Sequence, residues 1–147
     1  MIDDFHGEHF FLSNFFKSPV VYNGRTWPTV EHAFQAAKVD AETAEKIFHA
    51  ATPGEAKRLG RSGQMRSDWE SVKVDVMRKC LREKFLKNPS LKRRLLDTGD
   101  EILVEGTTWH DNYWGVCKCQ KCRNNGIVGL NMLGTLLMEI REEARNS

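Results

Sequence analysis

The stretch SDWESVKVDVMRKCLREKF, residues 67–85, is the clearest long helical pattern in the sequence. Its apolar residues recur three or four positions apart, and this spacing places them on one face of an α-helix. These residues are Trp69, Val72, Val76, Met77, Cys80, Leu81 and Phe85. Ser67 or Asp68 is a suitable N-cap, and Asn88 followed by Pro89 ends the pattern. The segment therefore predicts a long amphipathic helix.

Helical patterns continue on both sides of this segment. Pro28 and Thr29 are start signals for a helix whose apolar residues follow at helical spacing. Thr52 is expected to cap a second helix, with Pro53 at its first position and Gly60 at its end. Further helices are expected over residues 41–50, 91–96 and 130–145.

Extended structure is expected only in short pieces. Two apolar runs, residues 10–12 and 19–22, precede Asn23-Gly24, a strong hairpin signal. Another extended piece is expected at residues 102–105, followed by a loop over residues 106–126. Because strands and helices do not alternate, no parallel sheet is expected. The predicted fold class is mainly α: a compact single-domain helical bundle over residues 1–147 with a short β-hairpin or extended N-terminal segments.

The composition favours a cytoplasmic protein of one domain. A chain of 147 residues is long enough to bury a core without disulfides. The acidic N-terminus does not look like a secretory signal, and no apolar stretch is long enough to span a membrane, so no membrane partner is expected. The net charge of only +2 implies no broad basic surface, which leaves nucleic acid neither required nor excluded.

The helix that begins after Pro28 carries a polar triplet. Glu31, Gln35 and Lys38 stand at positions i, i+4 and i+7, so they share one side of the helix. A carboxylate and an amine on a half-buried side either pair with each other or serve a substrate. An ordinary exposed face with helical ion pairs is the alternative. Asn14, in a polar interruption between aromatic residues, either points its amide toward this helix or forms a turn.

Three of the four cysteines form the spacing C-x-C-x2-C in the run CKCQKC, residues 117–122. Together with His110, seven residues earlier, Cys117, Cys119 and Cys122 are candidates for a tetrahedral Cys3His zinc site. With four protein ligands such a zinc ion would be structural. A loop of free thiols is the alternative. Cys80 lies on the apolar stripe of the long helix and is expected in the core.

The tryptophans divide into two groups. Trp27 and Trp69 are expected to pack in the core. Trp109 and Trp114 lie in a loop with Asp111, where exposed rings near a site are more plausible. Flat aromatic rings are common platforms for a nucleobase or a sugar.

The segment RLGRSGQMR, residues 58–66, carries three arginines. Arg58, Arg61 and Arg66 in a basic loop at a helix end could accept a phosphate group. A solvated surface is the simpler interpretation.

Seven blocks of the sequence occur in order, at a characteristic spacing. They are FLSNF, GRTWPTVEHAFQAAK, AKRLGR, MRSDWESVKVDVMRKCLREKF, LVE, DNYWG and GLNMLGTLLMEIRE. Nearly the whole chain thereby resembles the YbiA-like, or NADAR, superfamily. Three of the blocks are longer than ten residues, so the likeness is far more specific than any single motif.

The resemblance implies a mainly helical N-glycosidase that cleaves a ribose-to-nitrogen bond without a cofactor. The implied substrates are an ADP-ribosylated guanine base or nucleotide, free or in nucleic acid, or a phosphoribosyl intermediate of the riboflavin pathway. It implies Glu31 and Lys38 as catalytic residues, with Lys38 forming an imine with the opened sugar. The residues that it implies for substrate binding are Asn14, Gln35, Arg66, Asp111 and Trp114.

One region departs from the family pattern. Val116 stands where an acidic residue is expected, and the cysteine tract replaces a short glycine-rich loop. This departure affects the expected substrate range more than the reaction, because the helix positions are intact. Two other functions remain open. One is a non-catalytic module that binds ADP-ribose or a nucleotide, and the other is an interaction protein whose long loop is held by a structural zinc ion.

Overall fold

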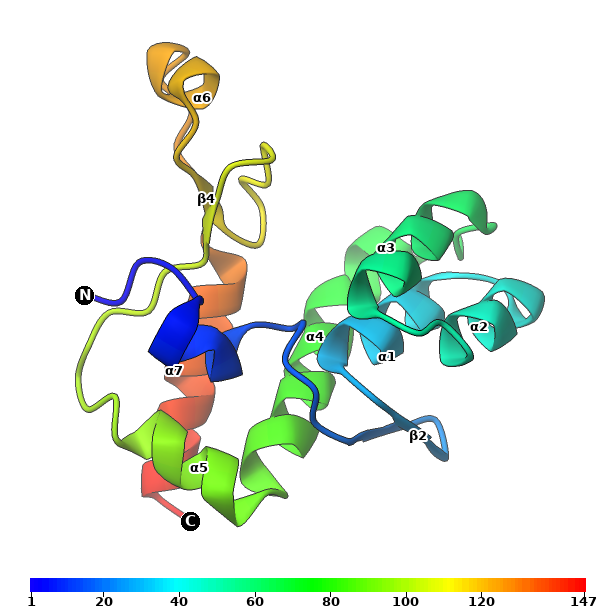
Figure 1. Ribbon diagram of the computed structural model, residues 1–147, viewed down its shortest axis with the longest axis horizontal. Coiled ribbons are helices and arrows are strands. Elements are labelled where there is room, and N and C mark those ends of the chain that lie inside the picture. The colour runs from blue at the N-terminus through cyan, green and yellow to red at the C-terminus, as the bar shows by residue number, and fades with distance from the viewer. The chain divides into compact units, whose positions relative to one another are not determined.

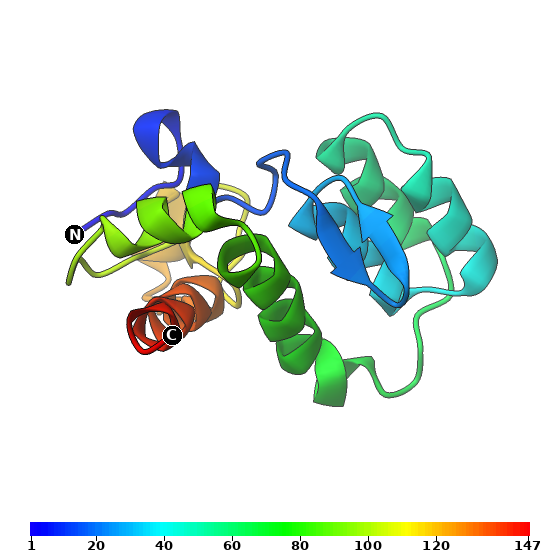
Figure 2. The same cartoon turned by 90° about the horizontal axis from the view of Figure 1, so that it is seen from below.

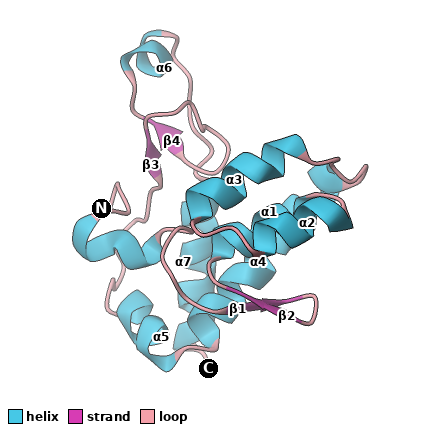
Figure 3. Cartoon of the chain, turned by 45° about the vertical axis from the view of Figure 1, so that its right-hand side comes forward, coloured by secondary structure: helices cyan, strands magenta, loops and turns pink.

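The computed structural model describes residues 1–147 and consists mainly of helices, with two short strand pairs (Figure 3). The helices are η1 (Gly7–Leu12, a 3₁₀-helix), α1 (Val30–Lys38), α2 (Ala41–Phe48), α3 (Pro53–Ser62), α4 (Trp69–Leu86), α5 (Pro89–Leu96), α6 (Gln120–Asn124) and α7 (Met132–Arg145). The strands are β1 (Val20–Tyr22), β2 (Arg25–Trp27), β3 (Gly106–Thr107) and β4 (Val116–Cys117). The predicted fold class is confirmed. None of the helices combines the length and apolar character needed to cross a membrane.

The chain contacts divide into two compact units, residues 14–88 and residues 1–13 with 89–147. In the first unit, α1 packs against α2, α3 and α4, so it is the central helix (Figure 1). The β1–β2 hairpin lies against α1 and α4 (Figure 2). Phe34 of α1 contacts Trp69 of α4, with the ring centroids 5.0 Å apart. As expected, Trp27, Trp69 and Cys80 are buried.

The predicted hairpin is confirmed. Val20 of β1 pairs with Trp27 of β2 in antiparallel register. Asn23 and Gly24 both adopt positive φ, 53° and 72°, which a two-residue hairpin turn with right-handed strand twist requires. The other apolar run, residues 10–12, was expected to be extended but belongs to η1. Phe11 and Leu12 are both buried there, whereas a strand would direct neighbouring side chains to opposite faces.

The expected helix starts agree with the structure in most cases. The Thr29 and Thr52 hydroxyls accept backbone N–H groups in the first turns of α1 and α3. Asp68 precedes α4 but makes no side-chain cap. Gly60 was expected to end α3, and this was wrong because the helix continues to Ser62. Gly60 is instead buried against Gln35 of α1.

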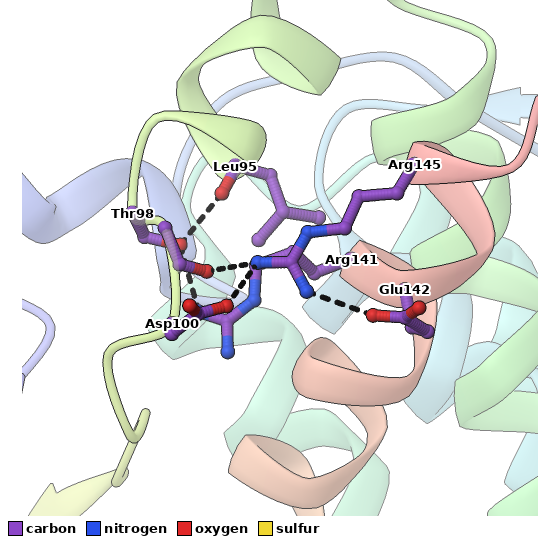
Figure 4. A network of polar contacts seen from close by, with 7 residues as sticks. Leu95, Thr98, Asp100, Arg141, Glu142 and Arg145 are labelled. Carbon is purple, nitrogen blue, oxygen red and sulfur yellow. Dashed lines mark hydrogen bonds and ion pairs between the residues drawn. The ribbon is translucent and has the colours of Figure 1, made fainter.

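In the second unit, α5 and α7 pack side by side (Figure 2). The segment after α5 is tied to α7 by two arginines (Figure 4). Arg141 donates to the Thr98 hydroxyl at 2.9 Å. Arg145 pairs with Asp100 at 2.9 Å and with Glu142 at 2.7 Å. These contacts fix the end of α7 to the turn that follows α5.

The segment expected as a plain loop, residues 106–126, contains regular structure. Its strands β3 and β4 pair in parallel, with Gly106 opposite Val116, and α6 follows β4 (Figure 1). Elements of two and five residues carry too little periodicity to be recognised from the sequence. Of the expected extended piece at 102–105, Leu103 forms a single bridge with Ile2.

Candidate functional site

The polar triplet lies on α1, the central helix of its unit. Glu31 and Gln35 are both buried, with 7% of each residue exposed. The Gln35 amide donates a hydrogen bond from Nε2 to the Glu31 carboxylate at 3.0 Å. Lys38 is the last residue of the helix and is half-buried. The simple exposed-face interpretation therefore fails for Glu31 and Gln35.

The environment of Lys38 favours its neutral form. Burial lowers the pKa of the Lys38 amine below 10.5, because a charged group loses hydration. The negative charge of Glu31 opposes this change, and the positive charge of Arg61 reinforces it. An amine with a lowered pKa is a better nucleophile near neutral pH.

Asn14 borders α1 through its backbone and its side chain is buried. Its carbonyl oxygen accepts the Glu31 backbone N–H at 3.1 Å, which joins the segment before the hairpin to the first turn of α1. Its amide Nδ2 lies 3.6 Å from the Met77 sulfur, and its Oδ1 is buried without a hydrogen-bond partner. Buried polar atoms rarely lack partners, so Oδ1 is an acceptor that a bound hydroxyl could satisfy.

Gly60 of α3 supports the Gln35 side chain. A Cβ atom at Gly60 would lie 2.0 Å from Gln35 Oε1 and 2.8 Å from Gln35 Cδ. Only glycine lets α3 approach α1 this closely without displacing the amide. The close approach of α3 at Gly60 therefore limits the movement of the Gln35 amide, which donates a hydrogen bond to Glu31.

Arg66 lies beside the end of α1 through backbone pairing. Its N–H donates to the Lys38 carbonyl at 3.0 Å, and Val39 bridges Met65 in the same short antiparallel contact. The Arg66 guanidinium forms two hydrogen bonds with Asp68, at 2.6 and 2.9 Å. Both groups are exposed, so the guanidinium is held in place but accessible to an anion.

The structure adds two residues that the sequence did not assign to this site. Arg61 had been considered only as a phosphate ligand, but its charge acts on Lys38. Burial raises the pKa of the Tyr22 phenol, Cys80 reinforces this, and the charge of Arg66 opposes it. Tyr22 therefore lies within electrostatic range of Arg66. No local sequence pattern could have revealed the proximity of Tyr22 and Arg66, since it arises from the packing of the β1–β2 hairpin.

His32, between Glu31 and Gln35 in the triplet segment, has a structural role. Its Nδ1 lies 2.8 Å from the Thr29 hydroxyl, and its Nε2 lies 3.0 Å from the Ala50 carbonyl. Burial lowers the pKa of the ring, although the Ala50 carbonyl and Glu55 oppose this. With both ring nitrogens engaged, His32 anchors α1 to the segment after α2 and is not placed as a base.

Asp111 and Trp114 belong to the other unit and form a turn there. Asp111 Oδ1 accepts the backbone N–H groups of Tyr113 and Trp114 at 3.1 and 2.9 Å. The Trp114 and Tyr113 rings pack edge to face, with centroids 4.9 Å apart. Trp109 is half exposed, as expected for this loop. That Asp111 and Trp114 serve the same substrate as Glu31 stays a prediction.

The predicted cysteine and histidine cluster does form. Nδ1 of His110 and the sulfur atoms of Cys117, Cys119 and Cys122 all lie within 4.8 Å of one another. All the cysteines are free thiols. Burial would raise the pKa of Cys117, but hydrogen bonds from Cys119 and His110 outweigh it and lower the pKa to about 6. The cluster thus has the donor set and spacing of a metal site.

Comparison with known proteins gives consistent matches. The NADAR domain family matches residues 3–145. N-glycosidase Npun_R5314 of Nostoc punctiforme is 43% identical over 141 residues, covering 92% of this chain and 85% of the relative. N-glycosidase YbiA of Escherichia coli is 46% identical over 135 residues, covering 90% of this chain and 79% of the relative.

Two further matches extend this picture. Riboflavin biosynthesis protein VVA0006 of Vibrio vulnificus is 40% identical over 144 residues, which cover 96% of this chain but 36% of that longer protein. The NMR structure of E. coli YbiA superposes with a TM-score of 0.80 at 40% identity, covering 99% of this chain and 88% of that chain. Sequence and fold therefore point to the same relatives.

Proposed function

We propose that this chain, which belongs to the NADAR domain family, is an N-glycosidase that hydrolyses a bond between a ribose carbon and a nitrogen atom. The resemblance drawn from the seven sequence blocks is confirmed by the family match over residues 3–145. Relatives at 43% and 46% identity are named N-glycosidases. We take both units as parts of one NADAR domain, and we place the enzyme in the cytoplasm, where its free thiols stay reduced.

The observation that carries the proposal is the arrangement of Glu31 and Lys38 on α1. A buried carboxylate, held by Gln35, lies on the same helix as a half-buried amine with a lowered pKa. Cleavage of an N-glycosidic bond develops positive charge at the anomeric carbon, which a carboxylate stabilises. An amine in its neutral form can attack that carbon.

The proposed reaction proceeds in two stages. The neutral Lys38 amine attacks the anomeric carbon, the carbon–nitrogen bond breaks, and the base leaves with a proton supplied through Glu31. The remaining amine proton then moves to the ring oxygen as the bond between that oxygen and the anomeric carbon breaks, which opens the sugar ring and gives an imine between Lys38 and the sugar. Water adds to the imine carbon, and the free sugar and the free amine are released. No cofactor takes part in this sequence.

The proposed substrate carries both a ribosylated nitrogen and a phosphate group. An ADP-ribosylated guanine base or nucleotide meets this description, and so does a phosphoribosyl intermediate of the riboflavin pathway. The charge of Arg61 acts on Lys38, and the Arg66 backbone pairs with that of Lys38, so we assign these two arginines to the phosphate group of the substrate. We assign Asn14 and Gln35 to the sugar, and Asp111 and Trp114 to the remainder of the substrate.

A substrate panel with matched variants tests the proposal. ADP-ribosylated guanine nucleotides and riboflavin-pathway phosphoribosyl intermediates are incubated with the protein, and released base and sugar phosphate are measured. Glu31→Gln and Lys38→Ala are each expected to lower kcat by about 10² or more, since each removes a group that acts in the transition state. Lys46→Ala, at an exposed lysine of α2, is the control and should keep full activity.

Borohydride trapping tests the covalent step separately. Reduction during turnover should leave a sugar adduct on the peptide that contains Lys38, detected by mass spectrometry, and the Lys38→Arg protein should give none. Turnover by Lys38→Ala at the original rate would contradict the role of Lys38. Tight binding of the panel compounds without release would instead favour a non-catalytic nucleotide-binding module.

A further inference from the structure

We propose that His110, Cys117, Cys119 and Cys122 bind one structural zinc ion. His110 Nδ1 lies 3.3 Å from the Cys122 sulfur, 3.4 Å from that of Cys119 and 4.0 Å from that of Cys117. A tetrahedral zinc ion with Zn–S bonds of about 2.3 Å and a Zn–N bond of about 2.0 Å places nitrogen and sulfur about 3.5 Å apart. The three distances scatter around that value, and all four donor atoms lie within 4.8 Å of one another, so one zinc ion can reach them all.

The groups around the sulfur atoms suit thiolates that hold a metal. The His110 backbone N–H donates to the Cys117 sulfur at 3.3 Å, and the Cys122 N–H donates to the Cys119 sulfur at 3.4 Å. Asn112 adds a side-chain donor to the Cys122 sulfur at 3.5 Å. Each sulfur thus accepts an N–H group that stabilises its negative charge and fixes its direction, as outer contacts do for metal ligands.

The donor set indicates which metal binds and what it does. Three thiolates and one imidazole exclude Mg²⁺ and Ca²⁺, which prefer oxygen ligands. Four protein ligands complete the tetrahedral coordination of zinc and leave no position for a reactive water molecule. Such an ion is structural. Three thiolates and Zn²⁺ carry a net charge of −1, and the exposed Lys121 and Arg123 of α6 offset it.

The ion would connect parts of the chain that the fold leaves weakly joined. Its ligands come from the turn at His110, from β4 and from the start of α6, elements of two and five residues with little structure of their own. Asn112 links the same parts, because its Oδ1 accepts the Cys117 N–H at 2.9 Å. Asp111 lies between His110 and Asn112. Zinc would therefore hold the turn of Asp111 and Trp114 in its observed form.

Metal analysis of the purified full-length protein tests the site directly. Elemental analysis is expected to give about one zinc per chain, and cobalt substitution should give the visible and sulfur-to-metal bands of tetrahedral thiolate coordination. Cys119→Ser and His110→Ala should each lose the metal. The controls are Cys80→Ala, at a core thiol outside the cluster, and His6→Ala, at an exposed histidine, and both should retain it.

Limited trypsin digestion gives a readout that depends on neither activity nor a mutation. The loop contains three cleavage sites, Lys118, Lys121 and Arg123. Removing the metal with a chelator should raise the cleavage rate at these sites at least tenfold, and added zinc should restore protection. The proposal is overturned if the unmodified protein is purified without zinc and takes up neither zinc nor cobalt, or if chelation leaves cleavage unchanged. Neither result bears on the Glu31 and Lys38 chemistry.

Discussion

Lys38 is the last residue of α1, and three features of its surroundings change the pKa of its amine. Burial lowers the pKa of its amine, Glu31 raises it, and Arg61 lowers it. Because the proposed attack requires a neutral amine, kcat/KM should rise with pH through the pKa of Lys38, below its ordinary 10.5. Replacing Arg61 with alanine removes a positive charge that favours deprotonation. The rise in kcat/KM should therefore move to higher pH in Arg61→Ala.

Arg58→Ala provides the matched control for this pH profile. Arg58 lies on α3, as Arg61 does, and is exposed. It pairs with Glu55 at 3.9 Å and is not among the groups that shift the pKa of Lys38. Its profile should overlay that of the unmodified protein. Coincident profiles for Arg61→Ala and the unmodified protein would show that Lys38 deprotonation does not limit the rate.

At the residue scale, the sequence predicted which residues lie together where that grouping follows from their spacing along the chain. Glu31, Gln35 and Lys38 could be grouped because three helical positions on one side follow from the α-helical period. The same reasoning applied to the cysteine tract, whose ligands lie close together in the chain. Arg61 could not be grouped with Lys38, nor Tyr22 with Arg66, because their proximity depends on how α3 and the hairpin pack.

At the scale of elements, the contact between α3 and α1 gives a testable prediction. In Gly60→Ala the new methyl group would meet the Gln35 amide, so the amide must leave its position or the two helices must separate. Either change weakens the hydrogen bond from Gln35 to Glu31. We expect kcat to fall by about tenfold or more, since a misplaced catalytic group costs up to about 10² in rate.

Gly54→Ala, in the first turn of the same helix, separates this effect from helix propensity. Its Cβ would meet nothing nearer than the Thr52 hydroxyl at 3.9 Å. Alanine should therefore leave kcat unchanged and stabilise the protein by up to about 1 kcal/mol in urea unfolding. Equal kinetics for Gly54→Ala and Gly60→Ala would contradict the supporting role of Gly60.

Element prediction succeeded where the signal lies within the chain segment itself. The capping threonines Thr29 and Thr52 and the turn at Asn23 marked boundaries that the structure confirms. Gly60 was misjudged because glycine at a helix end and glycine at a helix contact look alike in sequence. The pairing of β3 with β4 was missed because strands of two residues depend on their partner and not on a pattern of their own.

At the scale of the whole molecule, charge bears on the kind of substrate. Lys and Arg together number 22 against 20 for Asp and Glu, so the chain has little long-range attraction for a polyanion. Arg61, whose charge acts on Lys38, and Arg66, whose backbone pairs with that of Lys38, can bind a phosphate locally without a broad basic surface. This balance favours a small substrate over a long nucleic acid.

Competition with DNA tests the preference for a small substrate and does not require knowledge of which base the enzyme releases. Unmodified duplex DNA, added during cleavage of whichever small substrate is active in the panel, should leave kcat/KM unchanged at physiological salt. Raising the salt from 50 to 200 mM should lower kcat/KM by less than about tenfold, whereas a protein with 6–10 phosphate contacts loses about 10³–10⁵ in affinity. Strong inhibition by the DNA with a steep salt dependence would contradict the preference and would assign a nucleic-acid substrate.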